Sequence, residues 1–178
     1  MSTLKLIRWL ALAIFAAGAA YLAAIYPALP DRIATHLDFY GNPDGWGSKQ
    51  SFALIMCGVF GGINLLMLVV VPLLMRIVPG SMMNFPTRRM KEYWNATPER
   101  INTVKRRTLS ILPVTLVPLN LLFVLIVQFT YQGHMSDPVV RVPFMPAMLG
   151  SLALVLLSNA GIAAWLFWSL RVPRECGE

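Results

Sequence analysis

Four long apolar stretches constrain the fold of this 178-residue chain more than any other feature. A helix needs about 20 apolar residues to cross the roughly 30 Å hydrocarbon core of a bilayer, and stretches of this length lie near residues 6–26, 52–75, 109–131 and 147–168. With 57% apolar and 13% charged residues, the composition is unlike that of water-soluble domains. The sequence therefore predicts an all-α integral membrane protein, in which residues 1–178 form a single four-transmembrane-helix bundle.

The basic residues predict the orientation of this bundle, because positively charged segments stay on the cytoplasmic side during membrane insertion. Twelve of the fifteen Lys and Arg residues lie at the start of the first stretch, between the second and third, or after the fourth. Both termini and a loop over residues 76–108 are therefore expected in the cytoplasm, with external loops over residues 27–51 and 132–146. The net charge of +7 then suits anionic lipid at the cytoplasmic face, and no nucleic-acid partner is expected.

The interior of the stretches restricts both function and packing. Apart from Arg8 near the start of the first stretch, they contain no Asp, Glu, Lys, Arg or His. Pumps and ion-coupled transporters usually carry such groups at membrane depth, so neither class is expected. Small residues four positions apart and deeply placed amides favour helix packing, and a kink is predicted in the third helix at Pro113 and Pro118. The expected packing residues are Gly58, Gly62, Asn64, Asn120 and Asn159.

The first external loop is the most distinctive segment. Alternation from Thr35 to Phe39 favours a short extended piece, and Asn42-Pro43-Asp44-Gly45 has the composition of a turn. Trp46 is expected at the level of the lipid headgroups. The loop therefore predicts a structured cap over the outer end of the bundle. Its candidate structural or ligand-binding residues are His36, Asp38, Gly41, Asp44, Trp46 and Lys49.

An imidazole and two carboxylates in this loop allow two interpretations. His36, Asp38 and Asp44 could supply a metal site or an acid–base pair. Their spacing matches no zinc motif, and a further ligand would have to come from His134 or Asp137 in the other external loop. The favoured interpretation is that the side chains fix the shape of the loop, so that no metal and no cofactor is expected.

The cytoplasmic loop contains a clear helix start at Thr97-Pro98-Glu99, which combines a capping hydroxyl, a proline with a suitable φ and an acid in the first turn. A helix is predicted to begin there and continue into the third stretch. The preceding piece mixes aromatic and basic residues and is expected to lie in the headgroup region, or alternatively to dock a cytoplasmic partner. The candidate contact residues are Asn84, Pro86, Arg88, Arg89, Tyr93, Trp94 and Arg100.

Two motifs carry a resemblance to a known family. One runs from Leu29-Pro30-Asp31 through His36, Gly41 and Asp44 to Trp46-Gly47-Ser48-Lys49, and the other from Asn84-Phe85-Pro86-Thr87-Arg88 through Tyr93-Trp94 to Pro98-Glu99-Arg100. Together they resemble a bacterial membrane domain of unknown function, which also forms the N-terminal part of the immunity protein against the sporulation-delaying toxin of bacilli. That immunity protein protects the cell from a toxin and holds a transcriptional repressor at the membrane. The resemblance implies a place in the bacterial cytoplasmic (inner) membrane.

Three functions follow as expectations. The favoured one is a non-enzymatic membrane protein that binds or senses a protein or peptide partner through its external loop. The second is an accessory subunit of a larger membrane complex, which would pack against other chains through its small-residue faces. The third is a metal-dependent membrane-surface enzyme that uses His36, Asp38 and Asp44, although no phosphate loop or metalloprotease helix motif accompanies them.

Overall fold

The computed structural model describes residues 3–38, 43–135 and 144–172, and most of the chain is helical. Four helical segments are long and apolar enough to cross a membrane, which indicates a multi-pass membrane protein. The segments are α1 (Thr3–Ile25), α2 (Lys49–Leu65) continued through a π-helical turn η2 (Leu66–Val70) into α3 (Val71–Ile77), α5 (Pro98–Met135) and α6 (Phe144–Ser169). Shorter elements connect them: η1 (Tyr26–Ala28), β1 (Arg32–Leu37), β2 (Pro43–Ser48), η3 (Gly80–Met82) and α4 (Arg88–Asn95).

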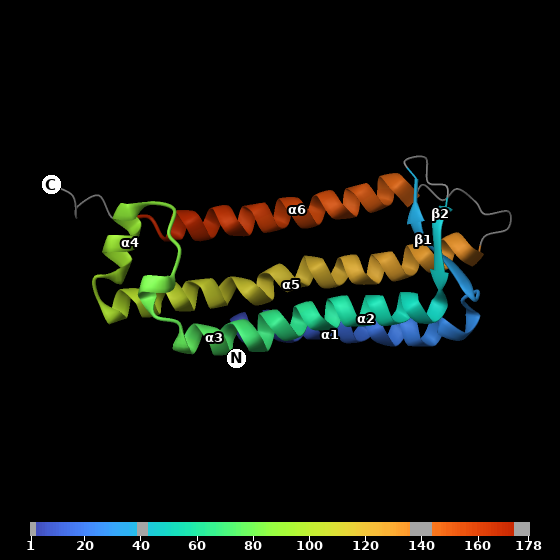
Figure 1. Ribbon diagram of the computed structural model, residues 1–178, viewed down its shortest axis with the longest axis horizontal. Coiled ribbons are helices and arrows are strands. Elements are labelled where there is room, and N and C mark those ends of the chain that lie inside the picture. Colours follow the sequence, from blue (N-terminus) through green and yellow to red (C-terminus); the bar gives the residue numbers. More distant parts are fainter. Residues whose placement is uncertain (1–2, 39–42, 136–143, 173–178) are drawn as a thin grey trace.

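The long helices run side by side, with the β1–β2 sheet at one end of the molecule and α4 at the other (Figure 1). We call these the sheet end and the α4 end. The start of α1 and the end of α6 both lie at the α4 end (Figure 1). Helix α5 packs against α1 and α2, whereas α6 packs chiefly against α5. The four long apolar helices that the sequence predicted are therefore present, with α1, α2 and α5 packed together and α6 at the flank against α5.

The loop between α1 and α2 folds into an antiparallel two-stranded sheet, so the fold is not purely helical. Pro43, Asp44 and Gly45 lie in β2 and not in a turn, which corrects the sequence prediction. Proline is tolerated as the first residue of a strand. A Cβ at Gly45 would lie 2.8 Å from the Cβ of His36, so this glycine permits the close approach of the two strands.

Strand β1 is anchored in the apolar core at the sheet end. The side chain of Ile33 is fully buried there, against residues of α1, α2 and α5. Phe60 and Phe123 continue the cluster, with ring centroids 4.9 Å apart. Because a buried side chain of this size contributes about 2 kcal/mol, the sheet is held against the helices by its own core residue.

Small residues permit close packing at a different position from the one that the sequence indicated. A Cβ at Gly18 in α1 would lie 2.8 Å from the ring of Phe123 and 2.9 Å from Val124 in α5. By contrast, a Cβ at Gly58 or Gly62 would meet no atom within 4 Å among the described residues. The close contact therefore joins α1 to α5, and no helix among the described residues packs on Gly58 or Gly62 as the sequence predicted.

Proline shapes the second span in a way that the sequence analysis did not anticipate. Pro72 lacks an N–H, so it cannot donate to the carbonyl of Leu68 four residues earlier. The π-helical turn η2 precedes it, and Nη2 of Arg8 in α1 donates to the Leu68 oxygen at 3.0 Å. The α5 helix, in contrast, continues without interruption through Pro113 and Pro118.

The predicted start of the third helix is confirmed. Helix α5 begins at Pro98 and continues to Met135. The Thr97 hydroxyl accepts a hydrogen bond from the Arg100 N–H at 3.3 Å, as an N-cap should.

Candidate functional site

The centre of the molecule holds a pair of buried amides. Asn64 of α2 donates to Oδ1 of Asn120 of α5 at 2.8 Å, and Asn120 donates to Oδ1 of Asn64 at 3.1 Å. Asn64 also donates to the Phe60 oxygen, and Asn120 to the Ala11 oxygen in α1, both at 2.8 Å. Asn120 is fully buried. The two amides thus join α1, α2 and α5, whereas Asn159 donates to Val155 within its own helix.

At the sheet end, the His36 imidazole and the Asp44 carboxylate are paired across the two strands through Nδ1 and Oδ1. Both side chains are exposed, at 72% and 48% of their surface. A pair this open to solvent contributes little to stability. It can, however, present a fixed donor and acceptor to a ligand. Gly41, which the sequence analysis named with this pair, lies outside the described residues.

The described residues contain no group of three or more His, Cys, Asp and Glu side chains placed to hold a metal ion. His36, Asp38 and Asp44 are all described, so they do not form the three-ligand site that the sequence left open. The register of the strand pairing shifts on both sides of His36, which breaks the alternation of side chains along β1.

His134, at the C-terminal end of α5, reaches the sheet but binds its backbone. Its Nε2 accepts a hydrogen bond from the Ala34 N–H at 2.9 Å, and its Nδ1 lies 2.7 Å from the Thr130 oxygen. In this arrangement Nε2 is the acceptor and Nδ1 the donor. The sequence analysis named His134 as a further metal ligand, but the described contacts give it the role of a link between β1 and α5.

The remaining candidate residues of the sheet are Trp46 and Lys49. Trp46 is 51% exposed, and its ring lies 5.6 Å from the Arg32 guanidinium and 6.4 Å from the His134 ring. Lys49 begins α2, and its ammonium group lies 3.0 Å from the Asp31 carboxylate. Lys49 thus joins the start of α2 to the residue before β1, while the Trp46 ring stays accessible to solvent.

At the opposite end, α4 covers the last turn of α6. The Trp94 indole N–H donates to the Leu170 oxygen at 2.7 Å, and the Arg107 guanidinium donates to the Ser169 oxygen. These carbonyls lie where a helix has no partners of its own. Met90 and Trp94 are buried against Val104 and Leu170, so Trp94 is not exposed for the lipid contact that was expected of it.

The other candidate residues at the α4 end lie nearer the surface. The Arg100 guanidinium lies 3.9 Å from the centre of the Tyr93 ring and donates to the Tyr93 oxygen. Arg88 forms an ion pair with Glu92 at 2.7 Å, one turn along α4. Arg89 is exposed. The second motif therefore builds α4 and fastens it to α5.

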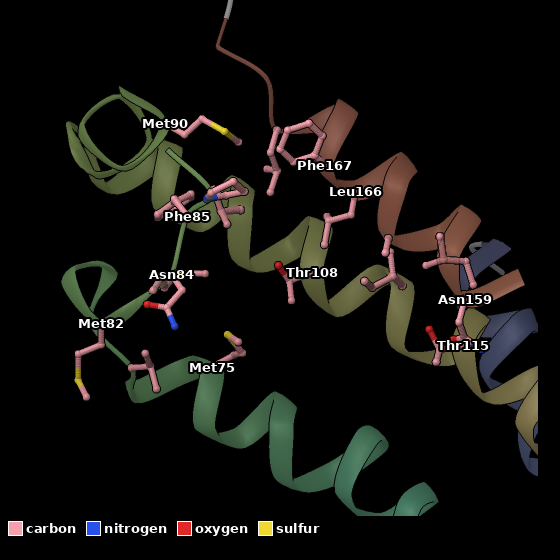
Figure 2. Close-up of a pocket in the computed structure, with 18 residues that line it drawn as sticks. Met75, Met82, Asn84, Phe85, Met90, Thr108, Thr115, Asn159, Leu166 and Phe167 are labelled. Carbon is pink, nitrogen blue, oxygen red and sulfur yellow. The ribbon is translucent and has the colours of Figure 1, made fainter. Parts of the chain in front are cut away.

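A groove of about 620 Å³ opens next to α4, and the residues that line it come from α3, from the segment 78–86, from α4, from α5 and from α6 with the residue after it (Figure 2). We call it the α3–α6 groove. Its walls are mostly apolar. Four methionines line it, and four polar side chains lie among them: Met75, Met82, Met83, Met90, Asn84, Thr108, Thr115 and Asn159. Pro86 also contributes to the wall, so two residues of the second motif, Asn84 and Pro86, belong to the groove.

Sequence reasoning missed the role of Arg8 and the capping role of Arg107. A signal existed for Arg8, since Pro72 leaves a carbonyl without its usual donor. For Arg107 the sequence carries no such signal, because its partner Ser169 is 62 residues away. Only the packing of α6 on α5 brings the two together.

Comparison with known proteins matches one segment of the chain to a family model. Residues 13–61 match the family model described as a domain of unknown function (DUF1648). No curated protein and no solved structure matches the chain. The resemblance expected up to Arg100 is thus found for residues 13–61, and the motif between Asn84 and Arg100 lies outside the match. The chain contains a segment similar to this domain of unknown function, comprising most of α1, the β1–β2 sheet and the first part of α2.

Proposed function

We propose that this protein is a non-enzymatic protein of the bacterial cytoplasmic membrane that binds an external protein or peptide through its β1–β2 sheet. Both termini and α4 lie in the cytoplasm, and the sheet lies outside. The distribution of charge supports this orientation. Among the described residues, only two Lys or Arg residues, Arg32 and Lys49, lie in or next to the sheet, whereas α4 and the first turns of α5 are rich in them.

One observation carries the binding proposal: the sheet is fixed on one side and accessible on the other. Ile33 in the core and the His134 hydrogen bond hold β1 against the helices. Thr35, His36 and Trp46 are exposed. A preorganised surface loses little conformational entropy when a partner binds, and Trp and Arg are enriched among the residues that contribute most to binding at interfaces.

The proposal is tested by photocrosslinking in living cells. A photoreactive residue at Thr35 should capture a discrete protein or peptide, because Thr35 is exposed on β1. The matched control is Leu54, which is 67% exposed on the apolar surface of α2. The binding proposal fails if neither Thr35 nor Trp46 yields an adduct.

The accessory-subunit function is a second candidate because Gly58 and Gly62 face open space on α2. Their spacing permits a helix of another chain to approach closely. An adduct at Leu54 together with none at Thr35 would favour this second function. An immunity role, which the sequence resemblance implies, predicts in addition that cells expressing the protein survive the sporulation-delaying toxin.

A further inference from the structure

The α3–α6 groove follows α6 from the α4 end toward the middle of the molecule. Asn159 and Leu170 both line it and are eleven positions apart on or just beyond α6. At 1.5 Å per residue, this separation is roughly 16 Å. The hydrocarbon core of a bilayer is about 30 Å thick. The groove therefore has the length of one leaflet.

The lining of the groove suits the acyl chain of a lipid. Its walls are mostly apolar and contain four methionines. Methionine side chains adapt to a flexible chain because they are unbranched and polarisable.

Two polar side chains, Thr108 and Asn84, line the groove near the α4 end. Thr108 lines the groove and follows Arg107 directly, so it lies at the level where α4 covers the end of α6. Asn84 is exposed at the same end of the groove (Figure 2). Within the described part of the chain, the Thr108 hydroxyl has no hydrogen-bond partner. A hydroxyl in an apolar environment is costly without a partner, and an ester oxygen can supply one.

Three cations adjoin residues that line this end of the groove. Arg76 directly follows the lining residue Met75, and Arg89 directly precedes Met90. Both are exposed, and neither has an ion-pair partner in the described ranges. The ammonium group of Lys105 donates to the oxygen of Val78, another lining residue, at 2.7 Å. No Asp or Glu lines the groove. This end is complementary to a phosphate group.

We propose that the α3–α6 groove binds one anionic phospholipid of the adjacent leaflet. One acyl chain lies between α3 and α6 against α5, the ester region is next to Thr108 and Asn84, and the phosphate faces Arg76, Arg89 and Lys105. This site is independent of partner binding at the sheet. A lipid bound here joins α6 to α3, which otherwise face each other across the groove.

The test is native mass spectrometry of the full chain released from vesicles of equal parts phosphatidylglycerol and phosphatidylcholine. The parent protein should retain one phosphatidylglycerol per chain. Ala163→Phe fills the groove and should remove it, whereas Leu157→Phe, at a 72% exposed position of α6 outside the groove, should not. Arg76→Gln and Arg89→Gln leave the groove open and should each lower the preference for phosphatidylglycerol roughly fivefold.

Three results would overturn the proposal. The parent could retain both lipids equally, Ala163→Phe could retain as much phosphatidylglycerol as Leu157→Phe, or the two arginine variants could keep the full preference. The arginine variants decide the case if Ala163→Phe does not fold, because they change exposed side chains only.

Discussion

Asn64 and Asn120 show how two side chains can determine which helices meet. In hydrocarbon, an amide without a partner is costly, and a helix pair that satisfies two amides at once is favoured over other pairings. The two side chains bond to each other, and Asn120 also reaches the Ala11 oxygen. The register of α1, α2 and α5 is thereby fixed near the middle of the spans.

Replacing Asn120 by Leu should lower the free energy of unfolding by about 1–2 kcal/mol, because three hydrogen bonds between helices are lost. Denaturation in detergent micelles measures this value. Asn159→Leu is the matched control, since the Asn159 amide donates only within its own helix. Equal unfolding free energies for the two variants would contradict the role given to the amide pair.

His134 illustrates a different use of a polar side chain. It was a candidate ligand because histidine binds metals, but its two ring nitrogens are both occupied by backbone groups. The sequence indicated the residue and not the role, because backbone partners leave no pattern in the sequence.

His134→Ala should therefore loosen β1 without unfolding the helices. Hydrogen exchange over residues 32–37 should become roughly fivefold faster, which corresponds to about 1 kcal/mol for a lost hydrogen bond. His36→Ala should change this exchange little, since its partner Asp44 is accessible to water. Unchanged exchange in His134→Ala would show that the link does not hold the sheet.

At the scale of elements, a hydrogen bond from Arg8 of α1 to the Leu68 carbonyl joins the second span to the first, four residues before Pro72. Arg8 supplies the Leu68 oxygen with the hydrogen bond that proline cannot donate. In a membrane this contact also gives the guanidinium group a partner at the start of a span.

A double-mutant cycle tests this contact. Arg8→Gln should lower the free energy of unfolding by about 1 kcal/mol in the parent protein. The loss should be smaller in a Pro72→Ala background, because the new N–H at position 72 can donate to the Leu68 oxygen. The coupling energy should be at least about 0.5 kcal/mol. Lys5→Gln, at an exposed position of α1, should show no coupling to Pro72→Ala. If the losses of unfolding free energy in Arg8→Gln and Pro72→Ala are additive, Arg8 does not compensate for the missing N–H of Pro72.

The same elements show what the sequence could predict. The four apolar helices and the start of α5 at Pro98 follow from length, hydropathy and capping, which are local properties. The β1–β2 sheet could be predicted only in part. The extended piece expected from Thr35 overlaps β1 (Arg32–Leu37), whereas Pro43, Asp44 and Gly45, which were expected in a turn, lie in β2. Their composition suits either a turn or close strand packing, and only the residues opposite them on β1 distinguish the two. Likewise, the aromatic residues of α4 could contact either lipid or the end of another helix. For Trp94 the packing of α6 determines the outcome, because its indole N–H donates to the Leu170 oxygen.

At the scale of the whole molecule, the two ends have different chemistry. The sheet end presents an accessible Trp and a His–Asp pair on a fixed strand pair. The α4 end carries the clustered cations and the α3–α6 groove. Four apolar helices separate these ends, and our account of function depends on their lying on opposite sides of one membrane.

Thiol labelling of single-cysteine variants tests this most directly. In a background with Cys57 and Cys176 replaced by Ser, Thr35→Cys on β1 and Arg89→Cys on α4 are treated with a membrane-impermeant maleimide. Both positions are exposed, so access depends on the side of the membrane alone. The account predicts labelling of Thr35→Cys in intact cells, and of Arg89→Cys only after the membrane is opened. Labelling of both from one side, or the reverse pattern, would contradict it.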